Sequence, residues 1–120
     1  MNKILLTLII GLYALTAQAT TCPNPLTSSL KWGEIPKPWV LNPFSSTPQG
    51  SPQTIFKQAH ILQARYGQGI VCTYQFPLGE YSIWQQVKVK LPAAGDYRWI
   101  ATYMGFICND SREICQFYTV

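Results

Sequence analysis

Four cysteines, Cys22, Cys72, Cys108 and Cys115, are the strongest constraint on how this chain of 120 residues folds. In a small exported domain an even number of cysteines is typical of a disulfide framework. In a cytosolic protein the same residues would more often bind metal or carry out redox chemistry. The cellular compartment therefore decides what these cysteines do.

The N-terminus predicts export. Lys3 supplies a positive charge, residues 4–15 form a largely apolar run, and Ala17-Gln18-Ala19 matches the small-x-small pattern before a signal peptidase cut. A run of twelve residues rises only about 18 Å as a helix, against about 30 Å for a bilayer core. We therefore predict a cleaved signal peptide over residues 1–19 and no transmembrane anchor after cleavage.

A lipid anchor on Cys22 is the alternative to a soluble exported protein. An acylated cysteine needs a small residue directly before it, whereas Thr21 precedes Cys22 here. The sequence therefore favours a soluble protein that is secreted or periplasmic.

Residues 20–120 have the length of one domain. Without Lys3 this part of the chain carries eight basic and five acidic residues, and the basic ones are scattered. No basic run could follow a phosphate backbone, and export makes nucleic acid an improbable partner.

Alternating side chains predict a mainly β fold. Residues 70–76 alternate strictly, and residues 80–91 place Val87 and Val89 on the face opposite Lys88 and Lys90. Residues 97–108 predict one long aromatic strand, or two that are broken at Gly105, and residues 115–120 close the chain. We expect a small single-domain antiparallel β-sandwich or open barrel that is stapled by two disulfides.

Local signals leave two structures open for residues 53–64. Ser51-Pro52 is a good helix start, and apolar residues recur at helical spacing up to a capping Gly67. The same stretch could instead form the first arm of a hairpin that turns at residues 66–69 and returns along residues 70–76.

The segment 21–52 is rich in proline, which excludes a long helix and a central strand. We expect short extended pieces near residues 30–32 and 39–41. The aromatic residues Trp32, Trp39 and Phe44 predict an ordered loop that they hold against the domain, because disordered segments lack such residues.

Among the three possible cysteine pairings we favour Cys108 with Cys115 across a hairpin, which places Phe106 and Phe117 on one side of a sheet. Cys22 then pairs with Cys72. Metal binding and redox catalysis are weaker interpretations, because the cysteines are widely spaced, no C-x-x-C occurs and His60 is the only histidine.

Nothing in the sequence predicts catalysis. The chain has no G-x-S-x-G motif, and most of its acidic residues fall in apparent turns with nothing to raise a pKa. We therefore expect no catalytic residue, no metal, no cofactor and no enzyme activity.

Binding is the more plausible role. Trp84 lies on the same face as Lys88 and Lys90 if its strand is regular, so an exposed indole beside cations could stack a sugar or anchor a protein. Alternatively, Trp84 packs under the proline-rich segment. A second candidate contact surface is the polar tip between the last two cysteines, with residues Asn109, Asp110, Ser111 and Arg112.

Four stretches carry a family resemblance: "TCPNP", "FKQA", "GIVCTY" and "CNDSREICQF". With these motifs the chain resembles the small secreted bacterial proteins grouped as domain of unknown function 3757. The resemblance implies a compact, disulfide-bonded, mostly β exported domain, favours a strand at residues 53–64 and brings no assigned activity.

The leading hypothesis is therefore a non-enzymatic module that binds a protein or a glycan outside the cytoplasm. The alternative is a secreted inhibitor of an extracellular hydrolase, similar to a lysozyme inhibitor, and a small hydrolase comes third.

Overall fold

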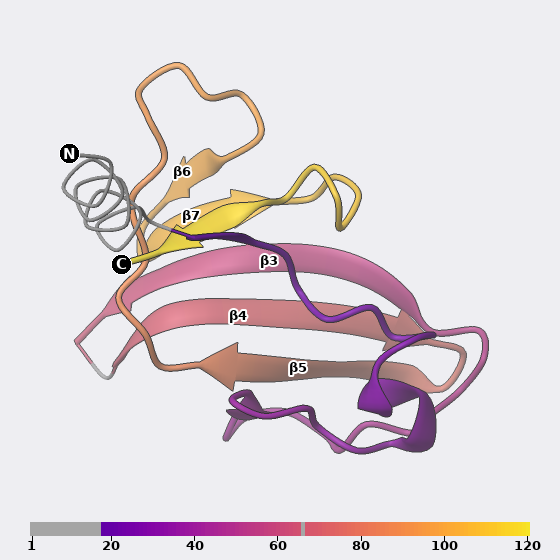
Figure 1. The fold of residues 1–120 in the computed structure, drawn as a ribbon. Helices are drawn as coiled ribbons and strands as arrows, with labels where there is room; N and C mark the ends of the chain where they lie inside the picture. The colour runs from indigo at the N-terminus through magenta and orange to yellow at the C-terminus, as the bar shows by residue number, and fades with distance from the viewer. Residues whose placement is uncertain (1–17, 66) are drawn as a thin grey trace, which may run out of the picture.

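The computed structural model describes residues 18–65 and 67–120, which form two antiparallel sheets (Figure 1). The larger sheet has the strand order β2-β5-β4-β3-β7-β6, and the smaller one pairs β1 with β8. The strands are β1 (Gln18–Thr20), β2 (Val40–Leu41), β3 (Ile55–Ala64), β4 (Gly67–Phe76), β5 (Gly79–Gln85), β6 (Ile100–Thr102), β7 (Gly105–Cys108) and β8 (Phe117–Thr119). The predicted mainly β fold with antiparallel sheets is confirmed.

Residues 53–64 form a strand and not a helix. β3 pairs antiparallel with β4 from Ile55 opposite Gln75 to Ala64 opposite Gly67, with a bulge between Phe56 and Gln58. The helical spacing was misleading because the neighbours Ile61 and Leu62 are both buried, on opposite faces of β3, and because the bulge between Phe56 and Gln58 interrupts the two-residue period of the strand. The turn expected at residues 66–69 was also misplaced, since β4 already begins at Gly67.

The core lies between one face of the larger sheet and the segments that cross it. Ile70, Cys72 and Ile83 on β4 and β5 are fully buried, and the buried Leu30 and Phe117 belong to the same hydrophobic cluster. In Figure 1 the N-terminal segment runs along β3 toward the far end of the hairpin. The Tyr74 hydroxyl fixes this segment by donating to the carbonyl oxygen of Pro23 at 2.5 Å.

Both expected disulfides are present, Cys22–Cys72 and Cys108–Cys115. The hairpin expected around the second one is wrong. β7 pairs with β3 and β6, whereas β8 pairs with β1, so this bond joins the larger sheet to the smaller one. Phe106 and Phe117 nevertheless both contact the core, as the spacing predicted.

The strand expected over residues 80–91 is divided between the two sheets. β5 ends at Gln85, and the chain then crosses to β8, where the Lys90 amide donates to the Tyr118 carbonyl at 2.8 Å. Val89 forms a β-bridge with Thr119 in the same crossing segment. Residues 97–108 form two strands, and the break lies at residues 103–104, directly before Gly105.

The proline-rich segment differs from the expectation at two points. Residues 30–32 belong to a short 3-10 helix, η1 (Ser29–Trp32), which the Ser28 hydroxyl caps at its start. Trp39 does hold the segment down by packing edge-on against Phe117. Trp32 and Phe44 do not, because 72% and 89% of their surfaces are exposed.

The predicted leader falls mainly on residues 1–17, which lie outside the described part of the chain. Its last two residues, Gln18 and Ala19, are paired with β8 in strand β1, so the predicted cut would leave only Thr20 of that strand. Within residues 18–65 and 67–120, no helix is both long and apolar enough to cross a bilayer.

Candidate binding sites

One row of side chains crosses the larger sheet on the face opposite the core. We call it the outer row, and its members, in the strand order β2-β5-β4-β3-β7-β6, are Val40, Trp84, Val71, His60, Ile107 and Ile100. All members except His60 are hydrophobic. Antiparallel sheets with one face in the core usually present polar side chains on the other, so this row is unusual.

The indole of Trp84 lies over Gly67 and Gly69 of β4, which have no side chains. A Cβ atom at Gly67 would come within 2.6 Å of the ring, and one at Gly69 within 2.9 Å of its nitrogen. The indole N–H donates to the Gln68 carbonyl oxygen at 3.2 Å. Trp84 is consequently only 8% exposed, and the exposed indole beside Lys88 and Lys90 is a wrong alternative.

A cavity of about 270 Å³ opens beside Trp84. Three of its lining residues, Asn42, Pro43 and Phe44, come from the proline-rich segment, so this segment borders Trp84, as the buried alternative required. None of the lining side chains carries a carboxylate, an ammonium or a guanidinium group. The lining consists of Asn42, Pro43, Phe44, His60, Leu62, Val71 and Trp84.

Hydrogen bonds to β5 hold the rim of this cavity in place. The Asn42 amide nitrogen donates to the Ser82 hydroxyl at 3.0 Å, and the Ser82 backbone donates to the Ser45 hydroxyl at 2.7 Å. The Phe44 backbone N–H donates to the Asn42 side-chain oxygen at 3.2 Å. The backbone of Phe44 is therefore anchored, while its ring is 89% exposed.

His60 is the one titratable residue in the cavity lining. Burial lowers its pKa below the usual value, and hydrogen bonding to the Met104 backbone opposes this shift. The ring is therefore neutral at neutral pH. The lining offers it neither a carboxylate to orient it nor a hydroxyl or thiol to activate, which the triad logic would require.

The two lysines of the predicted surface lie apart from Trp84. Lys88 and Lys90 are exposed on the segment that follows β5 and pairs with β8. Lys90 lines a second cavity together with Ile61 and Phe117, whose side chains belong to the core side of the sheet. The prediction that Trp84 and these lysines share one face assumed a strand that continues past Gln85, where β5 in fact ends.

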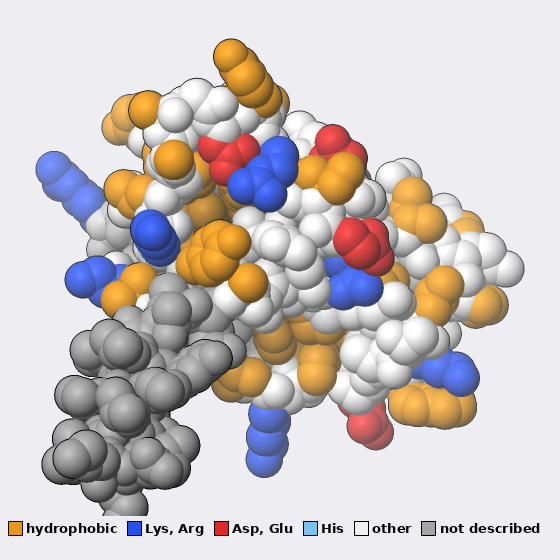
Figure 2. All heavy atoms as spheres, turned by 45° about the horizontal axis from the view of Figure 1, so that its top comes forward, with side chains coloured by type: hydrophobic (Ala, Val, Ile, Leu, Met, Phe, Trp, Pro, Cys, Tyr) orange, Lys and Arg blue, Asp and Glu red, His pale blue; other side chains and the backbone are white. Residues whose placement is uncertain are grey.

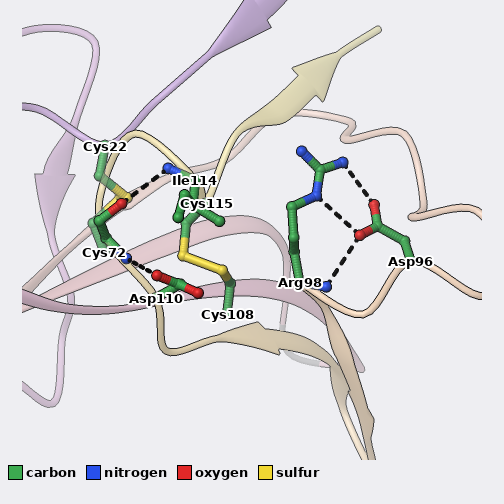
Figure 3. Close-up of a disulfide and its surroundings, with 9 residues drawn as sticks. Cys22, Cys72, Asp96, Arg98, Cys108, Asp110, Ile114 and Cys115 are labelled. Carbon is green, nitrogen blue, oxygen red and sulfur yellow. Dashed lines mark hydrogen bonds and ion pairs between the residues drawn. A yellow bond between two sulfur atoms is a disulfide. The ribbon is translucent and has the colours of Figure 1, made fainter.

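The loop between the last two cysteines is held from several sides (Figure 3). The Asp110 carboxylate accepts from the Ser111 backbone at 2.8 Å inside the loop closed by the Cys108–Cys115 bond. Arg112 reaches out of the loop and donates to the Cys22 carbonyl at 3.1 Å. Since its side chain is only 22% exposed, Arg112 fixes the loop, whereas the exposed Asn109, Asp110 and Ser111 form its free surface.

Phe44, Leu62 and Val71 line the Trp84 cavity but were not among the predicted binding residues. A signal for two of them exists in the sequence. Leu62 and Val71 are apolar residues on the face of β3 and β4 opposite the core residues Ile61 and Ile70, which indicates that something packs on this second face as well. The position of Phe44 depends on the contacts of a loop and has no comparable pattern.

The fold and these sites define a small disulfide-bonded β domain with one buried sheet face and one apolar cavity on the other. The chain belongs to the family described as "Protein of unknown function (DUF3757)", whose model matches residues 16–118. This confirms the resemblance drawn from the sequence motifs. No curated protein and no solved structure matches the chain.

Proposed function

We propose that the chain is an exported, non-enzymatic binding module that holds a protein partner by an apolar side chain inserted into the Trp84 cavity. The observation that carries this proposal is that an uncharged cavity has an exposed aromatic residue at its rim. This residue is Phe44, which is 89% exposed. A buried pocket beside an exposed aromatic side chain is the arrangement of a binding hot spot.

A protein fits this cavity better than a glycan does. Sugars stack on the flat face of an exposed aromatic ring, but the Trp84 ring is turned onto Gly67 and Gly69 and its N–H is already bonded to Gln68. The cavity volume of about 270 Å³ suits a single large apolar side chain better than an extended ligand. Location outside the cytoplasm is supported by the two disulfides, which persist in oxidising compartments.

The test is co-precipitation from extracellular fluid with the wild-type chain, Phe44→Ala and Leu78→Ala. Leu78 is a matched control, since it is 93% exposed on the β4–β5 turn and does not line the cavity. We expect the wild-type chain to capture one protein partner in stoichiometric amount. Phe44→Ala should bind this partner at least tenfold more weakly, whereas Leu78→Ala should bind it as the wild type does. Equal retention by all three proteins would refute the role of the cavity.

Inhibition of an extracellular hydrolase is the second candidate, and the loop 109–113 favours it. This loop is closed by a disulfide and bound to Thr21 and Cys22 through Arg112, so it loses little conformational entropy on entering an active site. If the captured partner is a hydrolase, its turnover should fall on addition of the wild-type chain. Asp110→Ala combined with Asn109→Ala should restore turnover, whereas Phe44→Ala should not if the loop is the inhibitory element.

A further inference from the structure

A second cavity, of about 170 Å³, lies on the other side of the larger sheet, between the crossing segment and β8. Its walls combine two cations, one carboxylate, one amide and three aromatic rings. The polar and aromatic lining residues are Lys90, Asp96, Arg98, Trp99, Gln116, Phe117 and Tyr118. No part of the proposed protein-binding function uses this cavity.

The charged pair in this cavity is held by three hydrogen bonds. Arg98 donates from Nε to Oδ1 of Asp96 at 2.9 Å and from Nη2 to Oδ2 at 2.8 Å, and its backbone N–H donates to Oδ1 at 3.1 Å (Figure 3). These hydrogen bonds from Arg98 lower the pKa of Asp96, so the carboxylate is ionised. Figure 3 shows the remaining guanidinium nitrogen of Arg98 turned away from Asp96. The pair therefore offers the free N–H groups of Arg98 as donors next to the carboxylate oxygens of Asp96 as acceptors.

The remaining walls supply charge and ring surface. Lys90 adds a second cation, so the lining carries two positive charges against the one negative charge of Asp96. Trp99 is 7% exposed and forms part of the core, which makes it a rigid wall, while Tyr118 is exposed at the opening. Figure 2 shows basic side chains beside hydrophobic ones at several points of the surface, and the lining of this cavity combines the two kinds in the same way.

We propose that this cavity binds a sugar ring that carries a carboxylate. Sugar hydroxyls can donate to Asp96 and accept from Arg98, and the excess positive charge of Lys90 and Arg98 accepts the ligand's carboxylate. The aromatic walls pack against the apolar faces of the ring. A simple inorganic anion would place a second negative charge beside the Asp96 carboxylate. An anion that also bears hydroxyls can donate hydrogen bonds to Asp96 while its carboxylate binds the cations.

The experiment is an NMR titration of the uniformly ¹⁵N-labelled chain with glucuronic acid, with N-acetylmuramic acid and, as the neutral control, with glucose. Both acidic probes are sugars with one carboxylate, which glucuronic acid carries on C6 and N-acetylmuramic acid carries on a lactyl ether. They come from host glycans and from bacterial cell walls, respectively. We expect at least one acidic sugar to shift the Trp99 indole N–H and the Gln116 and Tyr118 amides, with at least about tenfold weaker binding of glucose. The acidic sugar that binds more tightly identifies the source.

Two lysine variants provide the matched comparison. Lys90→Gln should weaken binding of the acidic sugar about five- to tenfold, whereas Lys88→Gln, two residues away and outside the cavity lining, should change it less than twofold. Equal effects of the two variants, equal binding of glucose, or identical shifts with sodium acetate would each overturn the proposal. Absence of shifts with both acidic sugars at concentrations of about 20 mM would overturn it as well.

Discussion

The indole of Trp84 lies on the bare backbone of Gly67, where an added Cβ atom would stand only 2.6 Å from two ring carbons. This contact seats Trp84 on β4 and thereby shapes the floor of the cavity on the outer face. Gly67 is needed because the ring lies against its backbone, whereas Gly69 is needed mainly because a Cβ atom there would come within 2.0 Å of the Gln85 carbonyl oxygen.

Gly67→Ala should therefore destabilise the domain by about 1–3 kcal/mol, since overpacking must displace the ring or the strand. Urea unfolding of the disulfide-intact protein measures this cost. In a Trp84→Leu background, where the ring is absent, the same substitution should cost less than about 1 kcal/mol. An equal cost in both backgrounds would show that the Trp84 contact does not explain the glycine.

Much of the fold could be predicted from short-range patterns. The strict alternation of residues 70–76 identified β4, and the spacing of Phe106, Cys108, Cys115 and Phe117 identified both disulfides and two core rings. The alternation of β4 is local. The Cys108–Cys115 bond was predicted from a hairpin that does not form, and Cys22–Cys72 followed as the pair that remained. Only the strand is therefore visible without knowledge of the tertiary structure, whereas the disulfides were a choice among three pairings.

The partners of the strands could not be predicted in the same way. The Cys108–Cys115 loop has the composition of a hairpin turn. However, β8 pairs with β1 and β7 pairs with β3, so the Cys108–Cys115 disulfide links segments of two different sheets. Similarly, nothing in the valine-lysine alternation of residues 87–90 indicates that the chain leaves the larger sheet at Gln85. Both outcomes depend on long-range packing, which local patterns do not encode.

The binding sites were predicted least well, because they combine residues from separate segments. The Trp84 cavity needs the loop around Phe44, which is positioned by hydrogen bonds to Ser82 on β5. Arg112, a predicted contact residue, is instead used by the fold itself. Sequence patterns identified the residue types but not which of them the folded chain leaves free.

The two disulfides should differ in their contribution to stability. The Cys22–Cys72 bond spans 50 residues and the Cys108–Cys115 bond spans 7. In the chain-entropy model these loops are worth about 4 and about 2.5 kcal/mol, respectively. Replacing each pair with serines adds the same local cost, since all four cysteines are completely buried, so the difference in unfolding free energy isolates the loop term. A larger loss for the short loop would contradict this account.

Arg112 should contribute to stability through the N-terminal segment. Its Nη1 donates to Thr21 Oγ1 at 2.9 Å and to the Cys22 carbonyl at 3.1 Å, and Gln at this position is too short to keep both. We expect Arg112→Gln to cost about 1–2 kcal/mol in urea unfolding. Glu113→Gln is the control, because it breaks only the ion pair to a 69% exposed carboxylate and should cost less than about 0.5 kcal/mol. Similar losses for the two variants would argue against the link to Cys22.

His60 should make the domain less stable in mild acid. Burial lowers its pKa in the folded state, so below the ordinary value of about 6.5 the unfolded chain binds a proton that the folded chain does not. The contribution of His60 is therefore fully present above pH 6.5 and is lost as the pH falls through the lowered folded-state pKa. Comparing the unfolding free energy of the wild type with that of His60→Gln between pH 7.5 and pH 5 isolates this effect, because the carboxylates titrate alike in both proteins. The wild type should lose more stability over this range than the variant. Parallel pH profiles would mean that the imidazole is as accessible to protons in the folded protein as in the unfolded chain, and that the Trp84 cavity does not shield it.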